Sequence, residues 1–393
     1  MTHPTPHPHA SLDHPALLAA AESRLPQMLQ DIERAISIET PSSDLDAVAR
    51  GAQDFAAIVT ERLGASPETV TVDGVTHLRL RFGSGPANVV LVNHQDTVWP
   101  HGTLERIPFS HEDGVVRGPG SFDMLTGAVM SVHATAMLLE QGGPEAVDGL
   151  SIVVTGDEEV GSATGAPLLR EEAAQARAAF VMEAAAGEGG ALKIARKGTS
   201  MYTLILRGRA SHAGLDPEKG VNAGLEMSHQ MLAVAALAHP ELGTTVTPTV
   251  FSGGTTTNTV PALARFDIDV RAKTQDELQR VDDAIRALRP VLDGAAIEVE
   301  GGINRPPMER AMAESLFDRA AALSAAVGIE APQGVEVGGA SDGNYTAGDG
   351  IPTLDGLGAV GDGAHAEHEH ALSAYIAPRT ALLAALIADQ LAD

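Results

Sequence analysis

Residues 89–96 read Val89-Val90-Leu91-Val92-Asn93-His94-Gln95-Asp96, an apolar run of strand length that ends in a histidine and an aspartate. The same arrangement recurs twice, with Glu158 and Glu159 after Ile152-Val153-Val154 and with Glu183 after Phe180-Val181-Met182. Short apolar runs of this kind are typical of buried strands in a parallel sheet. The carboxyl ends of parallel strands open on one crevice. The sequence therefore predicts that these polar side chains meet at one edge of a sheet.

Helical patterns separate these apolar runs. They cover about residues 16–38, 44–63 and 124–141. Because strands that alternate with helices favour the α/β class, we expect a mostly parallel mixed sheet flanked by helices. The helical and apolar patterns resume after Arg305-Pro306-Pro307. We therefore assign residues 16–199 and 306–393 to one catalytic α/β domain.

The intervening residues 200–305 have a different pattern, which is typical of half-exposed strands. In residues 264–271, apolar and charged residues alternate, and this places Phe266, Ile268 and Val270 on one face. Strands and helices follow one another here as strand–helix–strand–strand–helix–strand. This order predicts an inserted α+β domain of ferredoxin-like type with one open sheet face.

Composition limits the classes of function. The chain has 393 residues, which favours two domains over one core. Its formal net charge of −26, from 52 acidic and 26 basic residues, argues against binding to nucleic acid or to an anionic membrane surface. No apolar run reaches the about 18 residues that span a bilayer. Residues 1–15 lack the features of a secretory signal, so we expect a disordered lead-in and a cytoplasmic protein.

The absence of cysteine excludes thiolate zinc sites, so a metal ion in this chain requires His, Asp and Glu ligands. His94 and Asp96 stand on the same side of an extended chain, where Asp96 can fix the imidazole tautomer for metal binding. The alternative is a histidine whose ring only completes the hydrogen bonds at the end of the strand and binds no metal. Asp123 follows the turn Gly118-Pro119-Gly120, and it can either cap a helix or bridge two cations.

The run Asp157-Glu158-Glu159 places three carboxylates in a row. Crowded like charges raise one another's pKa unless a cation neutralises them. One of Glu158 and Glu159 can bind metal while the other acts as a base; a solvated acidic turn is the alternative.

Near the end of the chain, three histidines compete for one ligand position, namely His365, His368 and His370. Together these residues predict a site for two divalent metal ions with a spare carboxylate, and thus a metal-dependent hydrolase.

Several segments also occur in a characteristic order along the chain. They are His94-Gln95-Asp96-Thr97-Val98-Trp99-Pro100, residues 118–124, residues 157–162, Met182-Glu183, Ser211-His212-Ala213-Gly214, Gly338-Gly339-Ala340-Ser341-Asp342 and residues 361–365. In this order they resemble the zinc peptidase family that contains glutamate carboxypeptidase, aminoacylase, acetylornithine deacetylase and succinyl-diaminopimelate desuccinylase. The resemblance extends from about residue 25 to the end of the chain, and residues 94–100 look most like the glutamate carboxypeptidase branch.

The resemblance implies a site for two divalent ions, Zn²⁺ or alternatively Co²⁺ or Mn²⁺. His94 and Glu183 would hold one ion, Glu159 and His365 would hold the other, and Asp123 would bridge them. The peptide bond after Asp123 would be cis. The family pattern thereby selects His365 among the three histidines.

The resemblance also implies roles around the ions. Glu158 would be the general base. His212 would stabilise the oxyanion in the active site of a partner subunit, so that residues 200–305 would form a lid and homodimerisation domain. Substrate contacts would come from Asn258, Arg271, Gly338 and Gly339.

One departure from the family pattern follows the bridging aspartate. The family has one residue there and then Lys-Gly, whereas this chain has Met124-Leu125-Thr126. The ligands are intact, so the departure bears on local packing and substrate preference.

We expect hydrolysis of an amide bond next to a free carboxylate, with Arg271 as a bidentate grip on that carboxylate. The reaction would release a C-terminal amino acid from a small peptide, deacylate an N-acyl amino acid or split a dipeptide. Two other classes of protein remain as alternatives. The first is a di-metal hydrolase of phosphoesters, which the negative charge disfavours. The second is a non-catalytic metal-binding assembly protein, which would have no use for a spare carboxylate as a base.

Overall fold

The computed structural model describes residues 13–392, which divide into two compact units. The first unit contains the described residues up to Ile194, Arg310–Glu336 and the described residues from Ser341 onward. The second contains Ala195–Glu309 and Val337–Ala340. Most of the predicted lead-in, residues 1–12, lies outside the described residues.

The main sheet of the first unit is mixed and mostly parallel, as expected. Its strand order is β1-β2-β6-β3-β7-β14. The strands are β1 (Glu68–Val72), β2 (Val75–Arg81), β3 (Val89–His94), β6 (Leu150–Thr155), β7 (Ala178–Val181) and β14 (Thr353–Leu354). β3 pairs in parallel with both β6 and β7, and β14 pairs in parallel with β7, whereas β1 and β2 are antiparallel to their neighbours.

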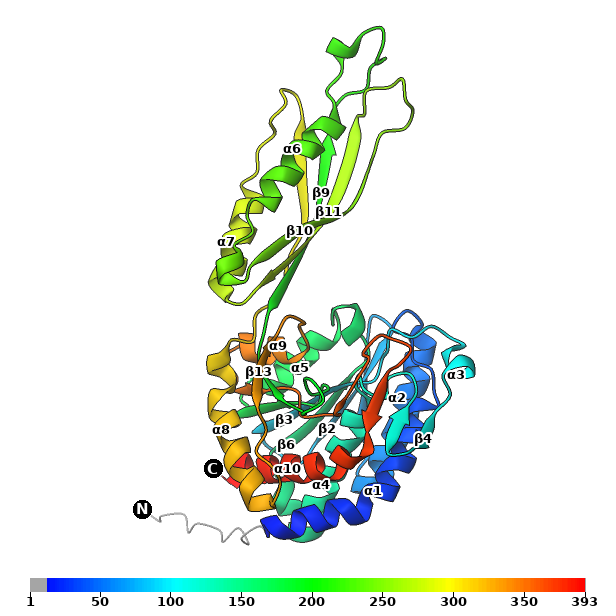
Figure 1. Ribbon diagram of the computed structural model, residues 1–393, viewed down its shortest axis with the longest axis vertical. Helices are drawn as coiled ribbons and strands as arrows, with labels where there is room; N and C mark the ends of the chain where they lie inside the picture. Colours follow the sequence, from blue (N-terminus) through cyan, green and yellow to red (C-terminus); the bar gives the residue numbers. More distant parts are fainter. Residues whose placement is uncertain (1–12, 393) are drawn as a thin grey trace. The chain divides into compact units, whose positions relative to one another are not determined.

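Helices cover both faces of this sheet (Figure 1). The helices of the first unit are α1 (His14–Ile36), α2 (Leu45–Leu63), α3 (Thr103–Arg106), α4 (Leu125–Gly142), α5 (Gly165–Ala173), α8 (Arg310–Val327), α9 (Gly343–Gly348) and α10 (Ser373–Ala392). Helix α1 begins two residues before the expected start, because the side chain of Asp13 accepts a hydrogen bond from the backbone N–H of Ala16.

The burial of β3 explains why its sequence has no polar alternation. All six residues of β3 are buried. Val90 and Val92 pack in one cluster with Leu168 and Leu169 of α5. The alternate residues of the strand point to the other face, where α4 and α10 contact β3. Because both faces of β3 are covered, its first four residues are all apolar, and polar residues occur only at its end, Asn93 and His94.

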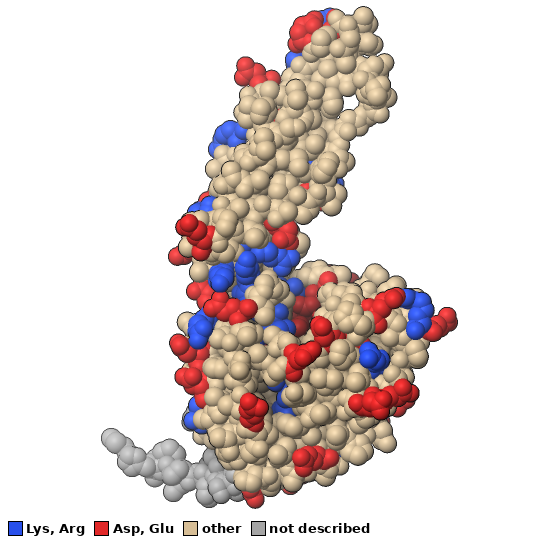
Figure 2. Space-filling model, viewed as in Figure 1, with Lys and Arg blue, Asp and Glu red and all other residues tan. Residues whose placement is uncertain are grey.

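Smaller sheets accompany the main sheet, and the sequence patterns did not predict them. One has the order β15-β16-β5-β4 and is formed by β4 (Ser110–Glu112), β5 (Val115–Arg117), β15 (Gly361–Asp362) and β16 (His370–Leu372). A two-stranded sheet pairs β8 (Leu192–Arg196) with β13 (Gly334–Val337). Figure 2 shows that acidic side chains are dispersed over the visible face of the first unit.

The second unit has the expected strand–helix–strand–strand–helix–strand order. Its elements are β9 (Gly198–Arg207), α6 (Ala223–Ala235), β10 (Thr245–Gly253), β11 (Leu263–Ala272), α7 (Gln275–Arg286) and β12 (Ala296–Arg305). The sheet is antiparallel, with the order β10-β11-β9-β12. Phe266, Ile268 and Val270 are buried in its core, together with residues of α6 and α7, which confirms the face predicted from the alternation.

None of the helices within residues 13–392 combines the length and the apolar character that a membrane crossing requires.

Candidate metal centre

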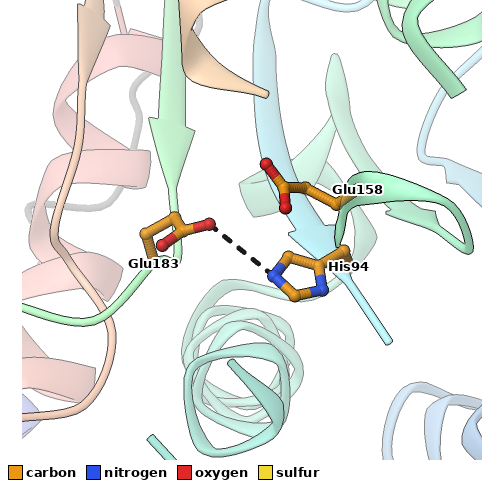
Figure 3. A group of neighbouring side chains, drawn as sticks. All are labelled: His94, Glu158 and Glu183. Carbon is orange, nitrogen blue, oxygen red and sulfur yellow. Dashed lines mark ion pairs between the residues drawn. The ribbon is translucent and has the colours of Figure 1, made fainter. Parts of the chain in front are cut away.

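Three side chains meet where the parallel strands of the main sheet end. His94 is the last residue of β3, which lies between β6 and β7. Glu158 begins the turn after β6, and Glu183 follows β7 by two residues. One ligand atom from each lies within 4.8 Å of the others, and Nε2 of His94 is 3.6 Å from Oε1 of Glu183 (Figure 3). The sheet topology therefore brings together residues that are distant in the sequence.

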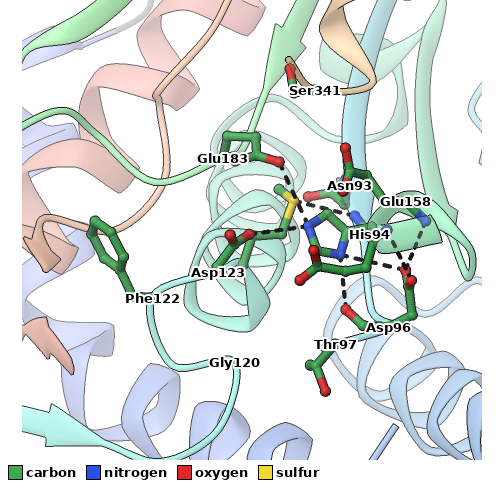
Figure 4. Close-up of polar contacts among 12 residues, drawn as sticks. Asn93, His94, Asp96, Thr97, Gly120, Phe122, Asp123, Glu158, Glu183 and Ser341 are labelled. Atoms are coloured by element: carbon green, nitrogen blue, oxygen red, sulfur yellow. Dashed lines mark hydrogen bonds and ion pairs between the residues drawn. The ribbon is translucent and has the colours of Figure 1, made fainter. Parts of the chain in front are cut away.

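A second group lies beside the first and consists of Asp123, Glu159 and His365. Their ligand atoms also lie within 4.8 Å of one another. Nε2 of His365 is 3.1 Å from Oε2 of Glu159 and 3.4 Å from Oδ2 of Asp123. The other carboxylate oxygen of Asp123, Oδ1, is 3.2 Å from Nε2 of His94 (Figure 4). Asp123 thus presents one oxygen to each group.

The position of Asp123 excludes the helix-cap interpretation. The residue that precedes α4 is Met124, and it makes no capping hydrogen bond through its side chain. The Asp123–Met124 peptide bond is cis, as the resemblance implied. The carboxylate of Asp123 faces the two histidines instead of the first turn of the helix.

The structure gives Asp96 more contacts than the sequence indicated. Nδ1 of His94 lies 3.0 Å from the backbone oxygen of Asp96 and 3.5 Å from its carboxylate Oδ1, so the main-chain oxygen is the nearer acceptor. The buried carboxylate also accepts hydrogen bonds from the backbone N–H groups of Glu158 and Glu159, and from the hydroxyl of Ser42. Asp96 therefore supports both the histidine of β3 and the acidic turn after β6.

The acidic run after β6 is not a solvated turn. Asp157 and Glu158 are buried. The carboxylate of Asp157 accepts hydrogen bonds from the backbone N–H and hydroxyl of Thr164 and from the backbone N–H of Gly165. The first residue of the run thus fixes the start of α5, and the next two belong to the ligand groups.

Electrostatic interactions tie the two histidines to their carboxylate neighbours. Burial alone would lower the pKa of His94, but hydrogen bonds to the surrounding carboxylates, with Asp123 first, raise it well above its ordinary value. Hydrogen bonds with Asp123 and Glu159 raise the pKa of His365 to about 10. Burial would raise the pKa of Asp123, yet both histidines lower it. Burial raises the pKa of Glu159.

These donors fit a pair of divalent cations. The two groups supply imidazole nitrogens and carboxylate oxygens, which Zn²⁺, Co²⁺ and Mn²⁺ accept as ligands. Oε1 of Glu159 is buried and makes no hydrogen bond with any of residues 13–392. A buried acceptor without a donor costs free energy, and a cation would satisfy it.

The remaining predicted site residues belong to the second unit, whereas both ligand groups belong to the first. Nδ1 of His212 accepts hydrogen bonds from the backbone N–H groups of Gly214 and Leu215, each at 3.1 Å. The neutral imidazole therefore carries its proton on Nε2, which leaves an N–H donor. The backbone oxygen of Asn258 accepts a hydrogen bond from the N–H of Ala213, so Asn258 lies beside the histidine loop.

Arg271 is engaged by an acidic neighbour. Its Nε and Nη2 donate to both carboxylate oxygens of Asp269, at 2.8 to 3.1 Å. A substrate carboxylate at this guanidinium would therefore compete with Asp269. In the loop after β13, Nη1 of Arg196 donates to the backbone oxygen of Gly339, the neighbour of Gly338.

Comparison with known proteins agrees with this geometry. Residues 90–389 match the peptidase family M20/M25/M40. Carboxypeptidase G2 of Pseudomonas sp. (strain RS-16) is 29% identical over 376 residues, which cover 94% of this chain and 90% of that protein. Succinyl-diaminopimelate desuccinylase of Methylorubrum populi is 25% identical over 331 residues, which cover 78% of this chain and 84% of that protein.

The fold is also similar to solved structures. Aminopeptidase PepT from Bacillus cereus superposes with a TM-score of 0.70 at 23% identity, over 95% of this chain and 99% of that chain. At this identity the likeness shows the arrangement of the chain and not its substrate.

Proposed function

The chain belongs to peptidase family M20/M25/M40, and from this premise we propose that it is a carboxypeptidase that releases a C-terminal amino acid from a small peptide. Membership of the family makes it a metallopeptidase or amidohydrolase. The observation that carries the proposal is the pair of ligand groups, in which Asp123 faces both His94 and His365 and the buried carboxylate of Glu158 lies with His94 and Glu183. Carboxypeptidase G2, which matches over 94% of this chain, supports the release of a C-terminal amino acid.

A second candidate is the removal of an acyl group from an N-acyl amino acid. The similarity to succinyl-diaminopimelate desuccinylase, at 25% identity, favours it. Hydrolysis of a dipeptide is a third candidate of the same chemical class. In all three an amide bond next to a free carboxylate is cleaved.

The residues that would hold the ions are those of the two groups other than Glu158, which we propose as the base. His94 and Glu183 would hold one Zn²⁺, Glu159 and His365 would hold the other, and Asp123 would contribute an oxygen to each. When bound, such a pair of ions polarises the substrate carbonyl and lowers the pKa of a water molecule. The same donors accept Co²⁺ or Mn²⁺.

Glu158 would act as the general base. Its carboxylate would take a proton from the water whose oxygen attacks the amide carbonyl carbon, and would return that proton to the nitrogen as the C–N bond breaks. One water is consumed, and a carboxylate and an amine are produced. The hydrogen bond from the N–H of Glu158 to Asp96 supports this role, because it holds the base in place.

The substrate contacts would come from the second unit. His212 of a partner subunit would donate its Nε2–H to the oxyanion, since Nδ1 is already an acceptor for two backbone N–H groups. Asn258, Gly338 and Gly339 would line the substrate. Arg271 would bind the substrate carboxylate, which would replace Asp269 as the partner of the guanidinium group.

Replacement of Glu158 by glutamine tests the proposal. The E158Q variant should retain two bound ions and lose most of its activity, about 10²- to 10⁴-fold, because glutamine cannot accept the proton. E188Q is a matched control, since Glu188 is exposed. Retention of activity by metal-loaded E158Q would reject the base role, and loss of an ion would make Glu158 a ligand. Turnover of a dipeptide, an N-acyl amino acid and an aryl phosphate by the wild type would distinguish the substrate classes.

We also propose that the second unit binds a second copy of the chain. Exposed apolar residues lie on α6 and on β10, which pack against each other, and β10 is the outer strand of its sheet. They are Leu225, Leu232, Val250 and Phe251, with exposed fractions of 56%, 74%, 68% and 63%. Charged side chains are sparse over the middle of this unit on the face that Figure 2 shows. An apolar surface beside an open strand edge suits isologous pairing with a copy of itself.

The mass of the protein in solution tests the homodimer. Wild-type protein should have the mass of two chains in light scattering, and the L232E/F251E double variant should have the mass of one. V72E is the control, because Val72 is exposed on β1 of the first unit. A monomeric wild type would disprove the homodimer without affecting the assignment of Glu158.

A further inference from the structure

The carboxylate of Glu369 is part of none of the sequence motifs and takes no part in the proposed reaction, yet it accepts hydrogen bonds from four residues of those motifs. Glu369 is only 2% exposed. Its Oε1 accepts hydrogen bonds from the backbone N–H groups of Phe122, at 2.9 Å, and Asp123, at 3.1 Å. Its Oε2 accepts hydrogen bonds from Nε1 of Trp99, at 2.7 Å, and from the N–H of Gly120, at 3.0 Å.

These donors come from two stretches that flank the metal centre. Trp99 lies five residues after His94, and residues 120–123 form the turn that ends at the shared carboxylate of Asp123. Figure 4 shows this turn, with Asp123 directed toward His94. Glu369 therefore contacts the main chain of Asp123, and the side chain of Asp123 faces both His94 and His365.

The fold explains why Glu369 reaches this turn. It stands directly before β16, and His370 of β16 pairs with Arg117 of β5, the strand that leads into the turn. The N–H of Glu369 donates to the backbone oxygen of Ala366, which closes the loop that also carries His365. One loop thus supplies a side chain of the second ligand group and the support for Asp123.

The two oxygens of Glu369 match these donors, because each oxygen offers acceptor positions and each accepts two hydrogen bonds. A glutamine at this position would present an NH₂ group either to the N–H groups of Phe122 and Asp123 or to those of Trp99 and Gly120. Two donors would then lose their acceptor in a buried environment, whichever way the amide is oriented.

We propose that Glu369 is a positioning residue of the metal centre. It fixes the main chain at Asp123 so that the two oxygens of that aspartate face His94 and His365, and it couples the loop of His365 to the same turn. This inference rests on the proposed function, because it assigns Asp123 to the two ions.

Metal titration of the full-length protein tests the role. Metal-free wild type and E369Q are titrated with Co²⁺ or Zn²⁺ in a calorimeter, and E369Q should bind the ions about 10- to 100-fold more weakly, as when other supports of ligands are removed. E367Q is the matched control. Glu367 is on the same loop, but its side chain is 73% exposed and pairs with Arg106. E367Q should bind the ions like the wild type.

Kinetics and fluorescence separate positioning from a general loss of stability. At a fixed, limiting metal concentration the kcat of E369Q should fall while KM for the substrate is unchanged, and excess metal should restore kcat. The chain has one tryptophan, so its emission reports on the indole that bonds to Glu369. The emission should change in E369Q and stay unchanged in E367Q.

The outcomes distinguish this inference from the proposed function. A wild type that binds no ions removes the proposed function itself. A wild type that binds two ions, with an equal affinity in E369Q, overturns only the role of Glu369. If E369Q does not fold, W99F decides, because it removes one donor and keeps the carboxylate. A weaker metal affinity in W99F supports the role, and an unchanged affinity overturns it.

Discussion

Oδ1 of Asp96 accepts a hydrogen bond from the backbone N–H of Glu158 at 3.1 Å. This contact joins the end of β3 to the turn after β6, so the carboxylate close to the candidate ligand His94 also positions the proposed base. A carboxylate that holds two elements at once couples their geometry. Catalytic groups lose activity when they are displaced by about 1 Å, which makes this contact a sensitive point of the fold.

Replacement of Asp96 by asparagine should lower kcat/KM by about 10- to 100-fold. The amide would present an NH₂ group either to the N–H of Glu158 or to the N–H of Glu159 and the hydroxyl of Ser42, where the carboxylate now accepts. Steady-state kinetics at saturating metal would measure the loss. D113N is the control, since Asp113 is exposed in a turn. Equal activity of D96N and D113N would show that the carboxylate does not position the base.

Removal of His365 should release one of two bound ions and abolish most activity. Its Nε2 lies 3.1 Å from Glu159 and 3.4 Å from Asp123, and the structure places neither His368 nor His370 in a ligand group among residues 13–392. Metal content per chain, measured by mass spectrometry, should be lower in H365A and unchanged in H368A. A loss of metal in H368A instead would mean that the loop binds the ion through another histidine.

The stability of the second unit should depend on the charge of Glu277. Hydrogen bonds from Arg280 and Thr244 lower the pKa of Glu277 from 4.5 to about 2. Because the folded pKa is the lower one, the stabilisation is complete above pH 4.5 and is lost as the pH falls toward 2. The E277Q variant should be less stable at pH 7 by about 1.5 kcal/mol, the low end for a charged hydrogen bond, since Arg280 is partly exposed.

Urea unfolding at pH 7, 4 and 2.5 would measure this difference. The gap between wild type and E277Q should narrow as the pH falls, while E300Q, at an exposed position on β12, should follow the wild type throughout. A gap of constant size would exclude an ionised Glu277 as its source.

The departure from the family pattern at Thr126 should carry a measurable cost. Thr126 is fully buried in α4, and its hydroxyl makes no hydrogen bond within the described part of the chain. The T126V variant keeps the shape and removes the unpaired hydroxyl, so it should raise the free energy of unfolding by about 1 kcal/mol. T135V is the matched control, because the hydroxyl of Thr135, also buried in α4, donates to the backbone oxygen of Ser131. Thermal unfolding that ranked T135V above T126V would contradict the argument.

Local sequence patterns were sufficient for the larger elements. The apolar runs located β3, β6 and β7 within a few residues, because strands buried on both faces carry apolar side chains on both faces. Period-two alternation identified the buried face of β11, since its other face is open. The strands β4, β5, β15 and β16 were not predicted, because two or three residues are too few to show a period.

From the sequence, the residues of the candidate site could be predicted only together, because each of them alone has an ordinary structural explanation. The sequence by itself determined which residue types were available, the absence of thiolates, and the order of strand ends at which His94, Glu158 and Glu183 would emerge. Local composition could not choose among the three histidines near residue 365, and the choice came from the family resemblance. Local composition also gave no reason to assign Asp157, which anchors α5, a different role from the two glutamates that follow it.

Tertiary structure alone decided how the side chains share their contacts. Asp123 faces His94 with one oxygen and His365 with the other because a turn, a strand end and a distant loop pack at one sheet edge. Glu369 accepts hydrogen bonds from backbone N–H groups of that turn. Every residue except proline carries such a group, so the residue types in the sequence do not reveal these contacts. Sequence patterns record which side chains are buried or polar, whereas partners are set by the approach of segments far apart in the chain.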